Sequence, residues 1–255
     1  MNNPLIQIAK DLRIPQMGFG TYGLGRNATQ AILHALRSGY RHLDTADIYS
    51  SHSNIAEAIS QGGIPREEIF ITTKLWSHSL SAQRVGPAVD RFLRELNTEY
   101  IDLLLIHWPG NTPVAETLGA MDKARQAGRL RSLGVSNFDE ELVQECLDSG
   151  VPIVNNQIEC NLNHRPSGVL AFCSEHKITV TAYSPLEKGT GRQERVVTEL
   201  AKKYEVTREE VLLNWLMNKG MIVIPRSADP KHIVANFHAL AWELEAGDTD
   251  KIDNA

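Results

Sequence analysis

The sequence predicts a single parallel (β/α)8 TIM barrel with a short β-hairpin at its N-terminus. Eight short apolar runs recur along the 255 residues, and most of them lie about 25 to 30 residues apart, the length of one strand–loop–helix unit. The segments between them show the periodicity of amphipathic helices. A doubly wound sheet fits less well, because no GxGxxG motif follows the first run. We therefore expect residues 1–255 to form one barrel domain.

The expected strands are short runs rich in apolar and β-branched residues. Ahead of them, the stretch LIQIAKDLRIPQMG at residues 5–18 alternates around a turn, so we expect a hairpin that plugs the bottom of the barrel. The eight predicted strands occupy residues 16–22, 40–46, 69–75, 101–107, 131–137, 152–158, 178–184 and 221–227.

The expected helices follow the strands and several of them end in glycine, the usual stop signal. Asn137 is followed by Phe-Asp-Glu-Glu, which resembles the polar opening of a helix. The clearest helical patterns occupy residues 28–39, 81–97, 114–128, 139–150 and 207–220.

Composition excludes several classes of function. With 26 basic and 31 acidic residues the net charge is −5 and no basic run stands out, so we expect no nucleic-acid or membrane partner. The three cysteines show no CxxC spacing, and the nine histidines show no HxH or HExxH spacing, so we expect no disulfide and no metal site. We see no signal peptide and no apolar run of about 20 residues. We therefore expect a cytoplasmic protein. The sequence does not fix the oligomeric state, but no exposed heptad or interface stripe is evident, so a monomer is the expectation.

Four polar residues stand where predicted strands end. Asp44 and Tyr49 follow the second strand, Lys74 ends the third and His107 ends the fourth. Lys74 lies 30 residues after Asp44, and His107 lies 33 residues after Lys74, so each step matches about one unit. Because chemistry in such barrels takes place at the C-terminal ends of the strands, we expect the four side chains to converge there.

Such a cluster suits the protonation of an oxygen atom. A tyrosine has a pKa of about 10, and a nearby lysine ammonium is expected to lower it. An aspartate beside the buried lysine would keep that lysine charged, and a histidine would orient a carbonyl oxygen. Together they would act as a general acid with a polarising partner while a carbon atom receives a hydride.

Seven motifs, in order, resemble those of the aldo-keto reductase family: GYRHLDTADIY, ITTKLW, DLLLIHWP, GVSNF, NQIE, AYSPL and IPRS. The resemblance runs from Met17 to about Ile252. It points to the small bacterial reductases of methylglyoxal, diketo-gluconate and similar carbonyls, and it implies NADPH-dependent reduction of aldehydes and ketones with broad specificity.

The resemblance assigns a role to each of the four polar residues. Tyr49 would be the general acid, Lys74 would lower its pKa, Asp44 would anchor the lysine, and His107 would orient the carbonyl. These roles agree with those expected from the residue types.

The same resemblance implies an extended nicotinamide dinucleotide across the mouth of the barrel. Ser136, Asn137 and Gln157 would hold the carboxamide, and Tyr183 would stack on the nicotinamide ring. The residues expected along the pyrophosphate are Gly20, Thr21, Ser184, Pro185 and Leu186.

At the adenosine end the matching residues are Arg226, Ser227, His232 and Asn236. Arg226 suits a forked contact with a 2′-phosphate, although it could also only cap the rim. His232 stands where relatives have an arginine. We therefore expect NADPH to be preferred, with NADH as a weaker alternative and a smaller margin than is usual in the family.

The sequence departs from the family pattern in two places. Ser50, Ser51 and His52 replace the usual Gly-Asn-Glu or Asp-Asn-Glu, which we expect either to alter the tilt of Tyr49 or to be a harmless change at a helix start. Short loops and an early stop of the chain predict an open, shallow pocket for small or loosely held substrates. Its expected walls are Tyr22, Trp76 and Trp108, which could equally be packing residues.

Two other functions stay open at this point. A Schiff-base lyase would use Lys74 as its nucleophile, but it would need neither Tyr49 nor the cofactor-like stretches. A nicotinamide-binding sensor or regulatory protein with little turnover would keep the fold, but the intact set of four residues speaks against it.

Overall fold

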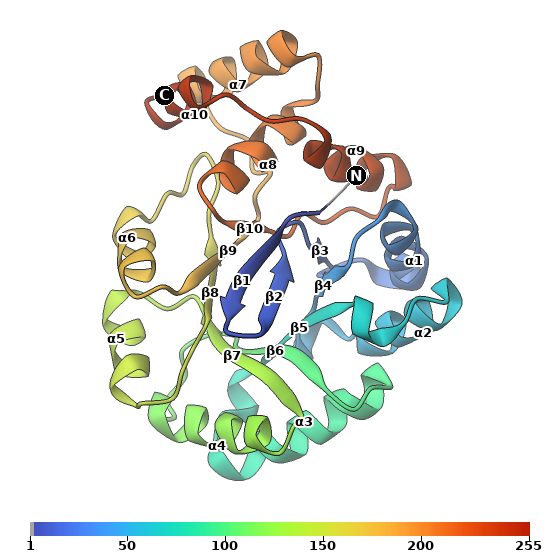
Figure 1. Ribbon diagram of the computed structural model, residues 1–255, viewed down its shortest axis with the longest axis vertical. Helices are drawn as coiled ribbons and strands as arrows, with labels where there is room; N and C mark the ends of the chain where they lie inside the picture. The colour runs from blue at the N-terminus through green and yellow to red at the C-terminus, as the bar shows by residue number, and fades with distance from the viewer. Residues whose placement is uncertain (1–2) are drawn as a thin grey trace.

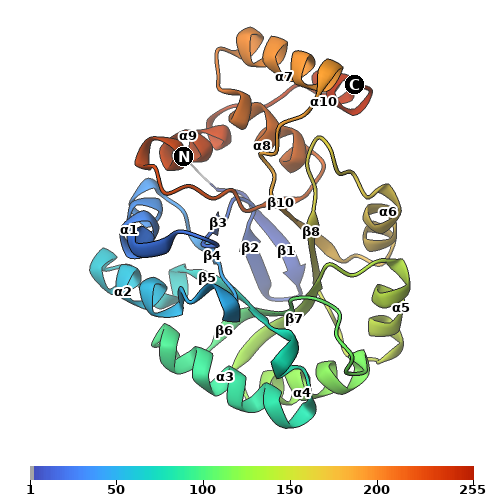
Figure 2. The same ribbon diagram turned by 180° about the vertical axis from the view of Figure 1, so that it is seen from behind.

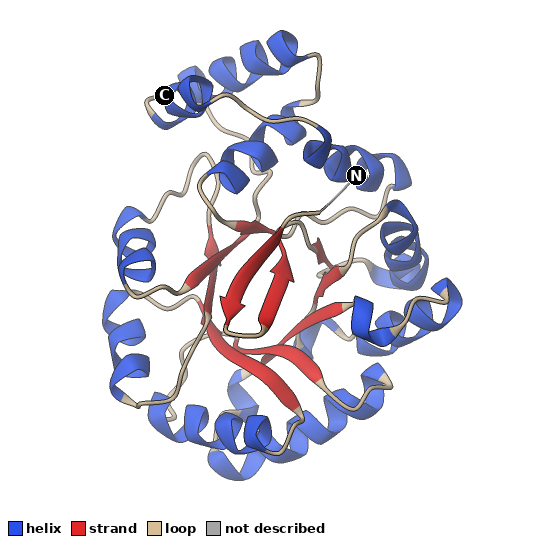
Figure 3. Cartoon of the chain, viewed as in Figure 1, coloured by secondary structure: helices blue, strands red, loops and turns tan. Residues whose placement is uncertain are grey.

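The computed structural model describes residues 3–255, and its centre is a ring of eight parallel strands (Figures 1 and 3). Neighbours in the ring are also neighbours in the sequence, from β3 to β10. A parallel bridge between Met17 and Val223 joins the first strand to the last, and Gly18 N donates to Val223 O. The strands are β3 (Phe19–Gly20), β4 (His42–Asp44), β5 (Phe70–Leu75), β6 (Ile101–Ile106), β7 (Leu130–Ser136), β8 (Asn155–Glu159), β9 (Thr179–Tyr183) and β10 (Ile222–Val223).

The α-helices lie outside the ring of strands (Figure 3). They are α1 (Ala28–Ser38), α2 (His52–Gly62), α3 (Ala82–Leu96), α4 (Val114–Gln126), α5 (Glu140–Asp148), α6 (Ser167–Glu175), α7 (Gly191–Tyr204), α8 (Arg208–Asn218), α9 (Pro230–His238) and α10 (Ala246–Asp253). Each of the eight predicted strands overlaps an observed one, so the predicted barrel is confirmed.

A hairpin of β1 (Leu5–Ala9) and β2 (Leu12–Pro15) covers one end of the ring (Figure 1). Its buried side chains Ile8 and Ile14 pack in one cluster with Phe70, Leu103 and Leu105 from inside the barrel. Phe70 begins β5, so the hairpin closes the end at which the strands start. The predicted plug is therefore present, and only the opposite end, seen in Figure 2, is left for a cavity.

The strands alternate between two environments, as a pleated sheet requires. In β5, Phe70 belongs to the inner cluster, whereas Ile71 and Leu75 belong to the larger core beneath the helices. Lys74 therefore faces the inside of the barrel and Thr73 faces the helices. This alternation aims a charged side chain into the interior at the C-terminal end of the strand.

The helix that follows β7 lies within the predicted range 139–150, but the start signal seen at Asn137 is not its cap. Asp139, and not Asn137, caps α5, because the Asp139 carboxylate accepts a hydrogen bond of 3.0 Å from Leu142 N. Asn137 instead has a φ angle of 62°, a left-handed conformation that asparagine adopts more readily than most residues. That conformation leaves its side chain free for the site at the end of the barrel.

Within residues 3–255, the helices are too short or too polar to cross a lipid bilayer.

Candidate active site

The four predicted polar residues come together at the C-terminal ends of the strands. Asp44 is the last residue of β4, Lys74 is the penultimate residue of β5, and His107 directly follows β6. Tyr49 ends a short 3-10 turn, Asp47–Tyr49, that follows β4. The parallel register places all four at one end of the barrel, as the one-unit spacing predicted.

Lys74 and Asp44 form a buried ion pair. Lys74 Nζ lies 2.5 Å from Asp44 Oδ1 and donates a second hydrogen bond of 2.8 Å to Thr45 O. The other carboxylate oxygen of Asp44 accepts a hydrogen bond of 2.7 Å from Gln157 Nε2. Lys74 is 1% exposed and Asp44 is 2% exposed. These contacts offset the cost of removing two charges from water and fix the lysine in place.

Tyr49 and His107 lie above this pair. The Tyr49 hydroxyl is 3.4 Å from His107 Nε2, and Lys74 Nζ is 5.1 Å from the centre of the Tyr49 ring. Trp76 packs edge-on against the imidazole, with ring centres 5.0 Å apart. A phenol, a neutral hydrogen-bonding imidazole and an ammonium group thus border the same small volume.

Burial is the largest cause of the pKa shifts of Tyr49 and His107. Burial, followed by the Asp44 charge, raises the pKa of Tyr49 above its ordinary value. Lys74 Nζ is 5.1 Å from the centre of the Tyr49 ring and is paired with Asp44 at hydrogen-bond distance. That Lys74 favours the phenolate of Tyr49 stays a prediction. Burial and the Lys74 charge lower the pKa of His107 to about 3, so its imidazole is neutral at pH 7.

Lys74 is poorly placed to act as a nucleophile. Burial lowers its pKa, and the charge and hydrogen bond of Asp44 act in the opposite direction. Its Nζ atom already donates to Asp44 and Thr45 O, and the side chain is inaccessible to solvent. The geometry therefore gives the Schiff-base hypothesis no support.

A cavity of about 590 Å³ opens above the four residues. Tyr22, Trp76 and Trp108 line it as predicted, and Tyr22 and Trp108 are 62% and 46% exposed. Four lining residues were not predicted from the sequence: Ile48, Glu187, Ile224 and Pro225. Ile48, Ile224 and Pro225 lie within motifs that were recognised, and Glu187 directly follows one. Their place in or beside those motifs was the one available signal.

Comparison with known proteins decides the family. The sequence model of the aldo/keto reductase family matches residues 16–255. The chain belongs to this family. It is therefore an oxidoreductase, as its motifs predict.

Relatives of this aldo/keto reductase include bacterial enzymes of the predicted subgroup. The chain is 32% identical to the glyoxal reductase of Bacillus subtilis, in an alignment covering 97% of this chain and 91% of that protein. It is 34% identical to methylglyoxal reductase DkgB of Escherichia coli O157:H7, covering 94% and 92%. The solved structure of a Bombyx mori aldo-keto reductase in complex with NADP has a TM-score of 0.92 and 32% identity, covering 100% of this chain and 93% of that one.

The residues predicted to hold the carboxamide form one connected group in this aldo/keto reductase. Asn137 Nδ2 donates to His107 O at 3.0 Å and to Ser136 Oγ at 3.1 Å. Asn137 Oδ1 accepts a hydrogen bond of 2.9 Å from the Tyr183 hydroxyl. Ser136 Oγ in turn donates to Gln157 O at 2.8 Å. All four line the cavity, so the ends of β7, β8 and β9 form one wall.

A neighbouring part of the wall comes from the ends of β3 and β10. Gly20, Thr21 and Arg226 line the cavity there, together with the segment 184–186 beyond β9. A Cβ atom on Gly20 would lie 3.0 Å from Ile224 O, so glycine permits the close approach of these two segments. The Thr21 hydroxyl donates to Asp44 O at 2.9 Å, which joins this wall to the catalytic end.

The residues predicted for the adenosine end lie farther out. Arg226 is exposed and forms no ion pair within residues 3–255. Ser227 Oγ accepts a hydrogen bond of 3.0 Å from Asp229 N at the start of α9. His232 and Asn236 are one turn apart on α9; His232 is exposed and Asn236 is 4% exposed. Neither of these two residues contributes to the lining of the 590 Å³ cavity.

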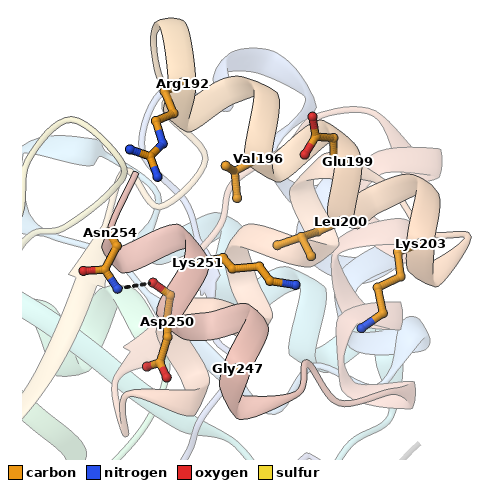
Figure 4. A pocket seen from close by; sticks show the side chains of 9 residues that line it. All are labelled: Arg192, Val196, Glu199, Leu200, Lys203, Gly247, Asp250, Lys251 and Asn254. Atoms are coloured by element: carbon orange, nitrogen blue, oxygen red, sulfur yellow. Dashed lines mark hydrogen bonds between the residues drawn. The ribbon is translucent and has the colours of Figure 1, made fainter.

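A second cavity of about 460 Å³ lies between α7 and α10, away from the ring of strands (Figure 4). Arg192, Glu199, Lys203 and Lys251 are among the residues that line it. Lys203 and Lys251 both pair with Asp248, at 2.6 Å each. The Lys203 pair joins α7 to α10, whereas the Lys251 pair lies within α10. The cavity lies outside the candidate active site.

Proposed function

We propose that this aldo/keto reductase reduces small aldehydes and ketones to alcohols with NADPH, and that Tyr49 supplies the proton. The observation that carries this proposal is the placement of the Tyr49 hydroxyl beside neutral His107 and above the buried Lys74–Asp44 pair, at the floor of an open cavity. Protonating a carbonyl oxygen requires a positioned acid and a hydrogen-bond donor, and these residues provide both.

The cavity fits a nicotinamide dinucleotide. Tyr183 forms part of its wall and its hydroxyl is held by Asn137, so the aromatic ring can support a planar heterocycle. At the far end, the unpaired guanidinium of Arg226 suits a phosphate. The NADP complex of the Bombyx mori relative supports this choice. When bound there, the nicotinamide would supply the hydride.

The phenol of Tyr49 would be the proton donor because its raised pKa keeps it protonated at neutral pH. The Lys74 ammonium, 5.1 Å from the centre of the ring, would stabilise the negative charge that develops as the proton leaves. Asp44 would hold that ammonium in place and charged. The phenol of Tyr49 would thus stay protonated before the reaction, and Lys74 would assist the loss of its proton during the reaction.

His107 would orient the carbonyl oxygen through Nε2. Its Nδ1 atom is buried and has no hydrogen-bond partner within residues 3–255, so we place the proton of the neutral ring on Nε2. A neutral imidazole donates one hydrogen bond without introducing a competing positive charge beside Lys74. Trp76 would keep the ring upright by its edge-on contact.

The mouth of the cavity favours small neutral carbonyl compounds. Tyr22, Ile48 and Trp108 are exposed there, and apolar surface of this kind binds apolar groups of a substrate. The charged side chains in the lining besides the Lys74 partner Asp44 are Glu187 and Arg226. The names of the glyoxal and methylglyoxal reductases support a small dicarbonyl as one substrate. Broad specificity follows from an open mouth with few polar contacts.

NADPH would be preferred over NADH through Arg226 and Ser227. Asn236 is buried and its side chain forms no hydrogen bond within residues 3–255, which leaves its amide available to the adenosine end. His232 is exposed on the same helix and would add only a weak contact at neutral pH. We therefore propose a moderate preference.

We further propose that residues 1–255 act as one catalytic domain and that the protein is a cytoplasmic monomer. The three cysteines are free and buried, which agrees with a reducing compartment.

The reaction class is tested by following NADPH consumption at 340 nm with methylglyoxal and 4-nitrobenzaldehyde, with alcohol products identified by chromatography. We expect turnover with both substrates, and slower turnover with NADH. Tight NADPH binding without turnover across a broad aldehyde panel would support the sensor hypothesis instead. Covalent trapping of a substrate on Lys74 by borohydride would support the lyase.

A further inference from the structure

The loop that carries Tyr49 is attached on its far side to α3 by a chain of charged contacts. Asp47 Oδ1 pairs with Arg91 Nη2 at 2.8 Å, and Arg91 Nη1 lies 3.5 Å from Glu95 Oε1. Glu95 Oε2 lies 2.7 Å from His52 Nδ1. We call these four residues, Asp47, Arg91, Glu95 and His52, the α3 clasp. Its two inner members are Asp47, two residues before Tyr49, and His52, three residues after it.

The inner members of the α3 clasp are buried and the outer members are half-buried. The side chains of Asp47 and His52 are 6% and 3% exposed, whereas those of Arg91 and Glu95 are 37% and 35% exposed. A buried carboxylate and a buried imidazole are costly unless they are paired. His78 Nε2 lies 3.3 Å from Asp47 Oδ2, but this oxygen accepts no hydrogen bond within residues 3–255, so Arg91 is the hydrogen-bonded partner of the carboxylate. Without the partners on α3, the loop would lose the contacts that make its burial favourable.

The α3 clasp also reaches the strand that carries Lys74. His52 Nε2 lies 2.8 Å from the hydroxyl of Thr73, the residue directly before Lys74 in β5. The imidazole packs on Phe92 of α3, with ring centres 4.8 Å apart. His52 is therefore the point at which the Tyr49 loop, strand β5 and helix α3 meet.

The loop needs such support because its backbone is strained. Ser50, between Tyr49 and His52, has a φ angle of 54°, a left-handed conformation that is unfavourable for serine. Ser51 is buried and hydrogen-bonds Thr45 Oγ1 at 2.7 Å. A strained conformation persists where surrounding contacts over-determine it, and contacts on both sides of Ser50 do so here.

We propose that the α3 clasp sets the position of the Tyr49 hydroxyl relative to His107 and Lys74, with His52 as a positioning residue. This inference rests on the proposed role of Tyr49 as the proton donor. The replacement of the family's usual glutamate by His52 leaves Tyr49 in reach of His107, and it does so by recruiting Glu95 as a partner. Where the sequence left an altered tilt or a harmless change open, this proposal gives His52 a specific role.

The central variant is Arg91→Met, which removes the link between Asp47 and Glu95 and keeps most of the side-chain volume. We expect kcat to fall about tenfold, because a small misplacement of a catalytic group is enough for such a loss, while the KM for the carbonyl changes less than twofold. Arg91→Lys should recover part of kcat. Arg94→Met is the matched control, since Arg94 is exposed on the same helix and forms no ion pair within residues 3–255, and it should match the wild type.

A second readout separates this inference from the proposed function. With 3-fluorotyrosine incorporated, the 19F resonance of Tyr49, assigned through Tyr49→Phe, should shift or broaden in Arg91→Met and in Asp47→Asn but not in Arg94→Met. This measurement needs no turnover, so it holds even if the wild type reduces none of the carbonyls tested. An unchanged Tyr49 resonance in both clasp variants, or a kcat equal to that of the wild type, would overturn the inference.

Discussion

The two ends of the barrel each bury an ion pair, and the two pairs have different surroundings. At the C-terminal ends of the strands, Asp44 and Lys74 lie beneath an open cavity. At the N-terminal ends, Asp102 near the start of β6 pairs with Arg66 at 2.7 Å and with Arg131 at 3.2 Å. Asp102 and Asp44 are equally buried, at 2% exposed. Burial of a charge therefore does not by itself identify a catalytic group.

The contacts of Asp102 all go to the framework. Its carboxylate also accepts a hydrogen bond of 3.0 Å from Ile71 N. The guanidinium groups of Arg66 and Arg131 both lie over the ring of Tyr100, at 4.2 and 3.8 Å from its centre. Nothing in this group lines either of the two cavities described above. The Asp44 pair, in contrast, lies next to a phenol and an imidazole that face open space. This difference distinguishes an ion pair suited to catalysis from one that stabilises the fold.

The largest expected effect is the contrast between the same substitution, Asp to Asn, made once at each end of the barrel. Asp44→Asn should lower kcat about a hundredfold, because Lys74 loses the charge that keeps it protonated and fixed. Asp102→Asn should lower the free energy of unfolding by about 3 kcal/mol, the usual cost of breaking a buried ion pair, with kcat within twofold of the wild type. Urea denaturation and steady-state kinetics on both variants check this. A large loss of kcat in Asp102→Asn would remove the distinction.

Acid should weaken the barrel through His42, a buried histidine at the start of β4. Burial lowers the pKa of His42 to about 4, and its ring hydrogen-bonds Thr72 Oγ1 at 3.0 Å. Because the folded-state pKa is depressed, the unfolded chain binds more protons. The stabilisation is thus complete above the unfolded pKa of about 6.5 and is lost as the pH falls towards 4.

At pH 5 this single group should cost about 2 kcal/mol of the free energy of unfolding relative to pH 7. Urea midpoints measured between pH 7 and pH 5 give the slope, and His42→Gln should flatten it. Exposed His164→Gln serves as the control and should leave the slope unchanged. An identical slope in His42→Gln would mean that other groups control the acid sensitivity.

A smaller effect is expected from trimming exposed apolar side chains at the two ends. Trp108→Ala at the cavity should raise the KM for 4-nitrobenzaldehyde about fivefold, the equivalent of losing about 1 kcal/mol of apolar contact, with little change in kcat. Leu5→Ala in the hairpin, at a side chain that is 57% exposed, should leave both constants unchanged. If both variants behave alike, Trp108 is only a surface residue.

The strand order and the convergence of Asp44, Tyr49, Lys74 and His107 could be predicted from the sequence for a physical reason. A parallel barrel advances one strand per unit, so polar residues at the ends of successive apolar runs must share one rim. The hairpin was also predictable, because its alternating pattern could bury one face only against the end of the barrel.

Other features depend on distances that a sequence does not contain. The pKa of Tyr49 depends on the burial of its ring and on its distance from Asp44, which are fixed only in three dimensions. The α3 clasp joins Asp47 to Arg91, 44 residues apart, through a helix face whose charges look like ordinary surface residues in the sequence. Asn137 resembled a helix start, and only its left-handed backbone reveals that its side chain turns into the site.

The most direct test of the central claim is the ratio of kcat in the wild type to kcat in Tyr49→Phe, measured with 4-nitrobenzaldehyde and saturating NADPH. Removing one hydroxyl should leave NADPH binding, followed by quenching of protein fluorescence, within twofold of the wild type. The account predicts that kcat falls by about a hundredfold or more, because the proton donor at the floor of the cavity is lost. Equal kcat values in the two proteins would contradict it and remove Tyr49 from the reaction.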